Sequence, residues 1–166
     1  MAYDAIQIAK YIINKAPYGL DNLKLQKILY YIQAAFLVER NKQCFNEELY
    51  AWEYGPAVKE VFAEFMVYGR DVIPPQDQAD KIIFDDKTFG VKRVKDKLFI
   101  DEQDKKIISK VINVYLETQD PFELVMKTRS EKPWLNARMS PDKIIKNEEV
   151  RSYYTVNRNK LYNRKN

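Results

Sequence analysis

Hydrophobic residues recur at steps of three and four over much of the first half of the chain. The first such segment runs from Ala2 to Lys15 and stops at the breaker APYG at positions 16–19. A second pattern starts after Asp21 or Asn22, either of which can cap a helix, and continues to about Arg40. We therefore expect two amphipathic helices. The apolar stripe of the second, which should face the core, consists of Leu25, Ile28, Leu29, Ile32 and Phe36.

Polar and amphipathic side chains share the second helix with this stripe. They lie off it, so we expect them to be more exposed: Lys24, Lys27, Tyr31 and Gln33. An exposed apolar row as long as the stripe would promote aggregation, which supports burial of the stripe itself.

The stretch WEYGP at 52–56 interrupts the helical pattern. Gly55 can turn the chain, and Pro56 suits the first turn of a helix, where its missing N–H costs nothing. We therefore expect a third helix from about Pro56 to Tyr68, ended by Gly69. Two roles stay open for the aromatic residues of the stretch. They fill the gap beside the turn, or they form part of a recognition surface at the helix N-terminus.

The second half of the chain is expected to contain a connector, a small hairpin and shorter helices. Alternating segments between residues 80 and 100 predict at most one small β-hairpin, with its turn near Lys95-Asp96. Three positions carry a helix-capping signal: Asp101, before a helix expected through Glu117, Asp120-Pro121 and Ser140-Pro141.

These elements together predict a mainly α fold. A chain of 166 residues with 46% hydrophobic residues suits one ordinary domain. We expect a single compact domain of about six or seven helices over residues 1–155, followed by a basic C-terminal tail over 156–166. From Arg151 onward the chain carries five basic residues and no acidic one.

Composition narrows the possible functions. A net charge of +4 is far from that of a dedicated nucleic-acid binder, although a basic tail interleaved with tyrosines leaves such contact open. The chain has no histidine, which removes Ser-His-Asp and Cys-His nucleophile systems and every His-ligated metal site. With four glycines it also lacks a GxGxxG or P-loop motif. We expect no enzyme, no cofactor and no metal site.

Carboxylates are the remaining candidates for enzymatic chemistry. Glu53, Glu60 and Glu64 lie near the aromatic turn. A cluster of glutamates on an exposed helix face is usually solvated surface, and this weighs against a catalytic role.

The expected location is the cytoplasm, with no membrane partner. No apolar run approaches the roughly 20 residues that span a bilayer, and the start MAYDAIQIAK lacks the pattern of a signal peptide. The single cysteine, Cys44, excludes an internal disulfide and fits a reducing compartment.

Three segments, taken in order, resemble one known family. They read NLKLQKILYYIQAAFL at 22–37, ELYAWEYGPAVKEVFAEF at 48–65 and ELVMKTRSEKPWLNAR at 123–138. Their order and separations resemble those of the Panacea domain, an antitoxin-type domain found in phage-associated proteins. The resemblance covers about residues 4–155.

The resemblance assigns motif positions residue by residue. The motif residues to which we give a mainly structural role are Leu25, Tyr30, Trp52, Gly55, Pro56, Pro133 and Trp134. Where the family usually has a histidine after Thr128, this chain has Arg129, which keeps a cationic donor but loses the imidazole. Lys27, Tyr54 and Arg129, one from each motif, are the candidate partner-binding residues.

The resemblance implies an antitoxin of a bacterial prophage or mobile element. Such a protein would neutralise a cognate toxin, encoded nearby, by direct contact. The alternative is a nucleic-acid-binding prophage regulator that uses the basic C-terminal segment, although no helix-turn-helix or RNA-binding signature supports it.

Overall fold

The computed structural model describes residues 1–77, 80–95 and 98–164 and confirms a mainly α single domain. The helices are α1 (Ala5–Lys15), α2 (Asn22–Glu39), α3 (Lys59–Phe65), α4 (Glu102–Tyr115), α5 (Pro121–Arg129), α6 (Lys132–Arg138), α7 (Asn147–Val156) and α8 (Arg158–Leu161), with a 3-10 turn η1 (Met66–Tyr68). Strands β2 (Gly55–Val58), β1 (Leu49–Trp52) and β5 (Ile144–Ile145) form one small antiparallel sheet in that order, and β3 (Asp80–Asp85) pairs with β4 (Gly90–Lys95).

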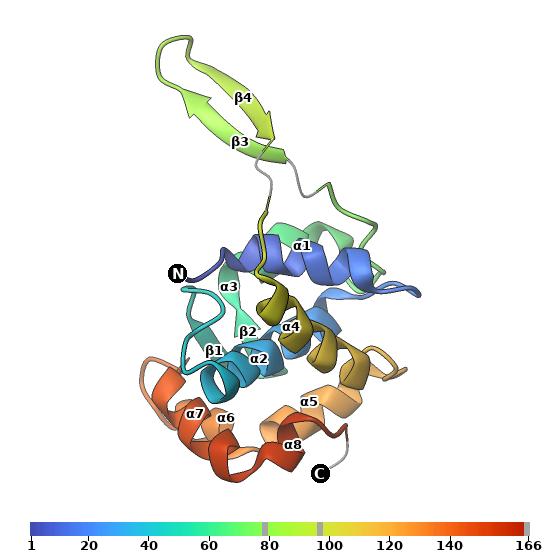
Figure 1. Ribbon diagram of the computed structural model, residues 1–166, viewed down its shortest axis with the longest axis vertical. Coiled ribbons are helices and arrows are strands. Elements are labelled where there is room, and N and C mark those ends of the chain that lie inside the picture. The colour runs from blue at the N-terminus through green and yellow to red at the C-terminus, as the bar shows by residue number, and fades with distance from the viewer. Residues whose placement is uncertain (78–79, 96–97, 165–166) are drawn as a thin grey trace.

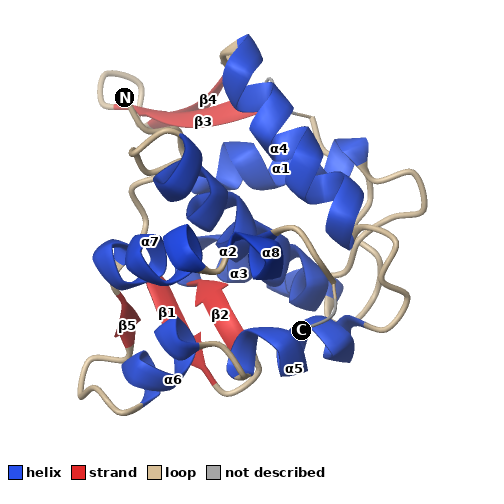
Figure 2. Cartoon of the chain, turned by 60° about the horizontal axis from the view of Figure 1, so that its bottom comes forward, coloured by secondary structure: helices blue, strands red, loops and turns tan. Residues whose placement is uncertain are grey.

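Helix α2 runs through the middle of the body, with α1 and α4 toward one end and α5 and α6 toward the other (Figure 1 and Figure 2). It contacts α4, α7, β2 and α5, so neighbours cover it on several sides. The predicted stripe is fully buried: Leu25, Ile28, Leu29, Ile32 and Phe36.

The expectation that the off-stripe residues of α2 are exposed is wrong. All four are buried: Lys24, Lys27, Tyr31 and Gln33. Because α2 is enclosed, its polar groups are satisfied internally. Lys24 Nζ donates to the carbonyl of Leu116 at 2.6 Å, and Gln33 Oε1 accepts from the amide of Cys44 at 2.7 Å.

Local capping fixes the helix starts that were predicted. The carboxylate of Asp21 accepts from the amide of Lys24, that of Asp101 from Gln103, and that of Asp120 from Phe122. These bonds satisfy amides that have no partner within the helix, which is why the three starts agree with the sequence.

The WEYGP stretch does not start a helix. Trp52 pairs with Gly55 across a tight turn, so the stretch joins β1 to β2, and the third helix begins at Lys59. Pro56 lies in β2, an edge strand of its sheet, where a missing N–H is tolerated. The expected helix start at Pro56 is therefore wrong.

Two further expectations need correction. Residues Ser140-Pro141 open no helix: the Ser140 hydroxyl donates to Asp142, and the chain enters β5 instead. In the β3–β4 hairpin, Asp85 pairs with Gly90, so its turn lies at 86–89 rather than near Lys95-Asp96. Asp96 itself lies outside the described residues. The hairpin projects from the helical body (Figure 1).

The C-terminal segment contacts the core. Leu161 in α8 is fully buried, and its carbonyl accepts from the Tyr115 hydroxyl at 2.6 Å. Arg158 pairs with Glu39 at the end of α2, at 3.1 Å. Part of the segment expected as a tail over 156–166 is thus an ordered helix on the body.

Within the described residues, no helix has both the length and the apolar character needed to cross a membrane.

Candidate functional site

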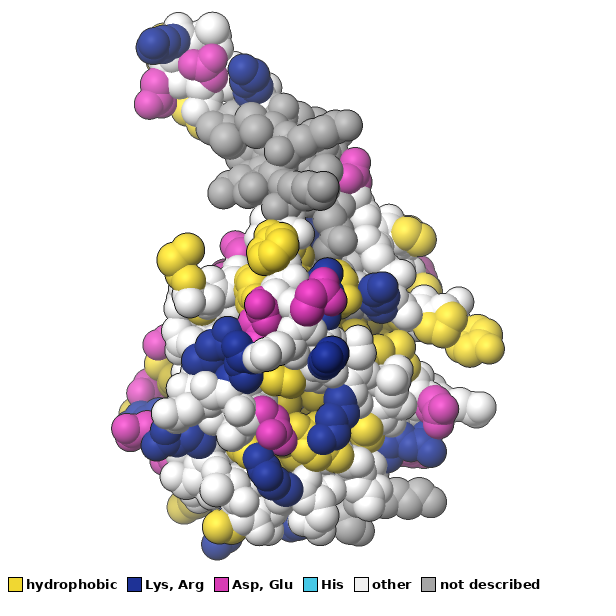
Figure 3. All heavy atoms as spheres, viewed as in Figure 1, with side chains coloured by type: hydrophobic (Ala, Val, Ile, Leu, Met, Phe, Trp, Pro, Cys, Tyr) yellow, Lys and Arg dark blue, Asp and Glu magenta, His cyan; other side chains and the backbone are white. Residues whose placement is uncertain are grey.

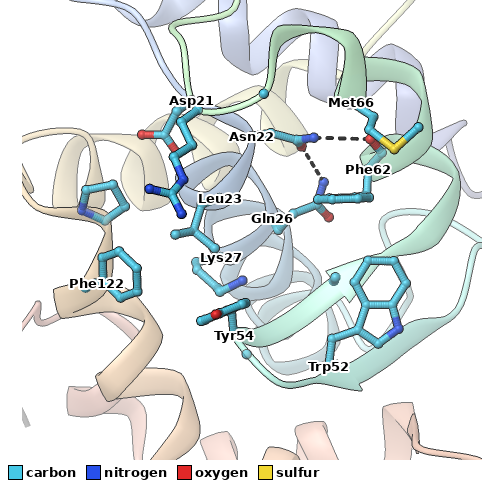
Figure 4. A pocket seen from close by; sticks show the side chains of 15 residues that line it. Asp21, Asn22, Leu23, Gln26, Lys27, Trp52, Tyr54, Phe62, Met66 and Phe122 are labelled. Carbon is cyan, nitrogen blue, oxygen red and sulfur yellow. Dashed lines mark hydrogen bonds between the residues drawn. The ribbon is translucent and has the colours of Figure 1, made fainter.

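A cavity of about 440 Å³ opens where the first turns of α2 meet the β1–β2 hairpin, α3, η1 and the start of α5 (Figure 4). Its walls are mostly apolar, and aromatic rings supply much of them. The aromatic lining residues are Trp52, Tyr54, Phe62 and Phe122. Phe62 and Trp52 meet edge to face, with ring centroids 5.2 Å apart.

A chain of side-chain amides holds the back of the cavity together. The amide of Val58 donates to Gln26 Oε1 at 2.8 Å, and Gln26 Nε2 donates to Asn22 Oδ1 at 2.9 Å. Asn22 Nδ2 then donates to the carbonyl of Phe62 at 3.1 Å (Figure 4). The first turns of α2 are thereby fixed to both β2 and α3.

Gly55 allows three elements to meet at the cavity floor. Its φ of +99° lies in a region that side chains disfavour. A Cβ at this position would lie 2.7 Å from Lys27 Cε and 2.7 Å from Thr128 Oγ1. The glycine of WEYGP is thus required both by the turn and by the close approach of α2 and α5.

Lys27 lies on the cavity floor with 1% of its surface exposed. Its ammonium group donates to the carbonyl of Pro56 at 3.1 Å. Burial lowers the pKa of Lys27 to about 7, and the carboxylate of Asp21 opposes this effect in part. The amine therefore changes its charge near neutral pH.

Trp134 connects α6 to the same hairpin from the other side. Its indole N–H donates to the carbonyl of Trp52 at 3.0 Å, and Arg138 donates to the carbonyl of Ala51 at 3.1 Å. The guanidinium of Arg129 lies 5.1 Å from the centroid of the Trp134 ring. Trp134 is buried, so it fixes the end of β1 while Arg129 covers it at the surface.

The structure places the three candidate partner-binding residues differently. Lys27 and Tyr54 line the same cavity, one buried and one exposed. Arg129 is exposed but is not part of the lining, and it contacts Trp134 instead. The three motifs therefore meet around the β1–β2 hairpin, with Arg129 outside the cavity lining.

Most of the remaining motif residues are buried, whereas Trp52, which lines the cavity, is half-buried. Leu25, Gly55, Pro56 and Pro133 have little exposed surface. Tyr30 is fully buried, and its hydroxyl accepts from Tyr154 at 3.0 Å.

A buried polar cluster was missed by sequence reasoning. Lys127 Nζ contacts Glu131 Oε1 at 3.1 Å and the Tyr31 hydroxyl at 3.0 Å, and it also donates to the carbonyl of Lys160. Tyr31 donates to Glu131 as well, and its ring stacks on Tyr115 at 4.4 Å. Burial lowers the pKa of Lys127 and raises that of Glu131. The spacing of four residues between Lys127 and Glu131 was the available signal.

The cavity-lining residues Asn22, Phe62, Met66 and Phe122 were also missed, because no local pattern separates them from ordinary core or surface positions.

Neither metal binding nor carboxylate catalysis gains support from the described part of the chain. No group of three His, Cys, Asp or Glu side chains there could hold a metal ion. The three glutamates considered for catalysis, Glu53, Glu60 and Glu64, are exposed.

Basic residues of the C-terminal segment are engaged within the molecule. Arg158 pairs with Glu39, Arg164 lies 3.9 Å from Glu117, and Lys160 donates to the Tyr153 hydroxyl at 3.0 Å. On the face shown in Figure 3, basic and acidic side chains are interspersed. Neither observation suggests a surface dedicated to phosphates.

Comparisons with known proteins agree with the motifs. The sequence model of the family described as "Antitoxin SocA-like, Panacea domain" matches residues 25–135, more than half of the chain. Antitoxin SocA of Caulobacter vibrioides (strain NA1000 / CB15N) is 33% identical over 69 residues. That alignment covers 40% of this chain and 37% of the relative. No solved structure matches significantly.

Proposed function

The chain belongs to the SocA-like Panacea antitoxin family, and from this premise we propose that it neutralises a cognate protein toxin by direct contact. Family membership indicates an antitoxin role and a non-catalytic regulator. The toxin is expected to be the product of a neighbouring gene, in a bacterial prophage or another mobile element.

One observation supports contact through the motif surface. The cavity beside the β1–β2 hairpin is lined in part by residues of the first two motifs and rimmed by two exposed aromatic side chains, Tyr54 and Phe122. Exposed apolar groups around a concave site are typical of protein interfaces. We therefore propose Lys27, Tyr54 and Arg129 as members of the partner surface.

The nucleic-acid alternative has no comparable support, since Arg158 and Arg164 are paired with carboxylates. Binding to nucleic acid that weakens steeply with salt would favour it.

Co-expression with the products of adjacent reading frames tests the proposal. The wild-type chain should relieve the toxicity of one of them and co-purify with it. Arg129→Ala and Tyr54→Ala should each weaken binding roughly thirtyfold, the effect of losing an interface anchor, while the melting temperature stays at the wild-type value. Full neutralisation by a folded Lys27→Ala/Tyr54→Ala/Arg129→Ala protein would place the partner surface elsewhere.

A further inference from the structure

We propose that the cavity is an anchor pocket for a toxin segment that presents an apolar side chain together with a carboxylate. This inference rests on the proposed antitoxin function and names the chemistry of the partner at the site.

The walls define the apolar part of the anchor. Trp52 and Phe62 form one side, and Phe122 from α5 lies on another (Figure 4). A volume of about 440 Å³ lies within the usual range for ligand sites of roughly 300–1,000 Å³. It is large enough for one bulky side chain and the backbone beside it.

The rim favours a protein over a free small molecule. Tyr54 is 54% exposed, Phe122 50% and Met66 61%, and all three line the mouth of the cavity. Tyr54 and Phe122 also contact each other edge to face, with centroids 6.2 Å apart. A small molecule inside the cavity would leave much of this apolar rim in water, whereas a protein segment that lies across it would cover the rim.

Lys27 on the cavity floor can donate further hydrogen bonds to an anionic oxygen acceptor. Among the described contacts, Lys27 Nζ has a single acceptor, the Pro56 carbonyl, whereas an ammonium group has three N–H donors. A carboxylate would supply both the missing acceptor and the opposite charge. Such charge-assisted bonds are stronger than those between neutral groups.

The other charged groups at the cavity are one cation and one anion, and the lining as a whole favours an anionic partner. Arg70 adds a second cation to the lining. The one acidic residue of the lining, Asp21, accepts from the amide of Lys24 at 2.8 Å and keeps its negative charge, so with Lys27 protonated the two cations leave the lining with one excess positive charge. Since Lys27 has a pKa of about 7, a bound carboxylate would raise that pKa and the complex would take up a proton.

A pair of matched fragments tests the chemistry without the toxin. The probes are 3-phenylpropionate and its neutral counterpart 3-phenylpropanamide, titrated into the ¹⁵N-labelled full chain and followed by NMR. A fragment of this size should bind with a dissociation constant on the order of 1–10 mM and shift the amides of Gln26 and Gly55. The acid should bind about tenfold more tightly than the amide.

Variants identify the side chain that is responsible for the preference for the acid over the amide. In Lys27→Met, acid and amide should bind about equally. Lys59→Met, an exposed lysine on α3 outside the cavity, should keep the tenfold preference. Leu23→Trp, at a partly exposed lining position, should block both fragments and serves as the second variant if Lys27→Met does not fold. Equal binding of acid and amide to the wild type, or no shift at the cavity, would overturn the proposal.

The toxin experiment separates this inference from the antitoxin proposal. If a neighbouring gene product is neutralised, Lys27→Met and Leu23→Trp should each weaken that complex at least about tenfold while Lys59→Met does not. Undiminished neutralisation by both cavity variants would overturn the anchor-pocket proposal but not the antitoxin proposal. If the wild type still binds the acid fragment in that case, the cavity is a site for a free small-molecule acid. Absence of any neutralised partner would instead overturn the antitoxin proposal.

Discussion

Gly55 combines two constraints at one position. Its backbone adopts a φ of +99°, and its missing side chain makes room for Lys27 Cε and Thr128 Oγ1. A glycine in a turn is usually required only for its positive φ. Here the absence of a side chain also lets α2 and α5 pack closely against β2, where Lys27 and Gly55 line the cavity.

Gly55→Ala should lower the free energy of unfolding by roughly 2–5 kcal/mol, from backbone strain and overpacking together. Gly69→Ala is the matched control, because Gly69 also has a positive φ, of 56°, but no atom within 4 Å of an added Cβ. Urea denaturation of both variants separates strain from contact. Equal losses in the two would show that the close approach at Gly55 is unimportant.

Lys27 should make stability depend on pH. Its pKa of about 7 in the folded protein lies below the usual 10.5, so between these values the unfolded chain binds more protons and stability rises with pH. From about pH 7 to pH 8.5 the wild type should gain roughly 1.5 kcal/mol relative to Lys27→Met. Because the two proteins share all other titrating groups, the contributions of those groups cancel in the difference between the two stabilities. Parallel stability curves for the two proteins would mean that Lys27 stays protonated throughout.

At the scale of elements, α2 is the part on which the others assemble. Its stripe residues follow a helical period, as the sequence indicated, but its polar side is enclosed as well. Lys24, Gln26 and Gln33 hydrogen-bond segments that lie far away in the sequence. These bonds connect α2 to the rest of the molecule in specific registers.

Leu29→Ala and Ile32→Ala should each cost about 2–5 kcal/mol, because both side chains are fully buried and their truncation leaves a cavity. Leu135→Ala, at an exposed position on α6, should change stability by less than about 0.5 kcal/mol. Thermal melting or urea denaturation measures all three. Wild-type stability of either α2 variant would contradict the burial of the stripe.

At the scale of the whole molecule, one buried ion pair joins distant parts of the chain. Lys127 and Glu131 connect α5 and the segment after it to Tyr31 in α2 and to the carbonyl of Lys160 in α8. This explains how a short C-terminal helix is held on the core. Removing one partner leaves the other charge buried without compensation.

Lys127→Met should therefore destabilise the protein by roughly 3–5 kcal/mol, whereas Lys127→Met/Glu131→Leu should recover part of the loss. Urea denaturation of Lys127→Met, Glu131→Leu and the double variant completes a double-mutant cycle for the pair. In Lys127→Met, hydrogen exchange should also rise in α8, where the Lys160 carbonyl loses its donor. A double variant less stable than both singles would argue against mutual compensation.

What the sequence determined by itself was local. The helix starts at Asp21, Asp101 and Asp120 follow from a side chain that caps amides two or three residues away. The buried stripe of α2 follows from helical periodicity. The three motifs also identified the family.

Only the tertiary structure decided the rest, because each decision depended on contacts with distant segments. Pro56 suits a first helical turn by local chemistry, yet it lies in an edge strand, since β2 pairs with β1 and is held by Gln26. Lys27 lies off the stripe, yet it is buried, since the hairpin and α5 cover that side of α2. Capping and periodicity act within one segment of chain, whereas burial and the cavity arise where segments tens of residues apart come together.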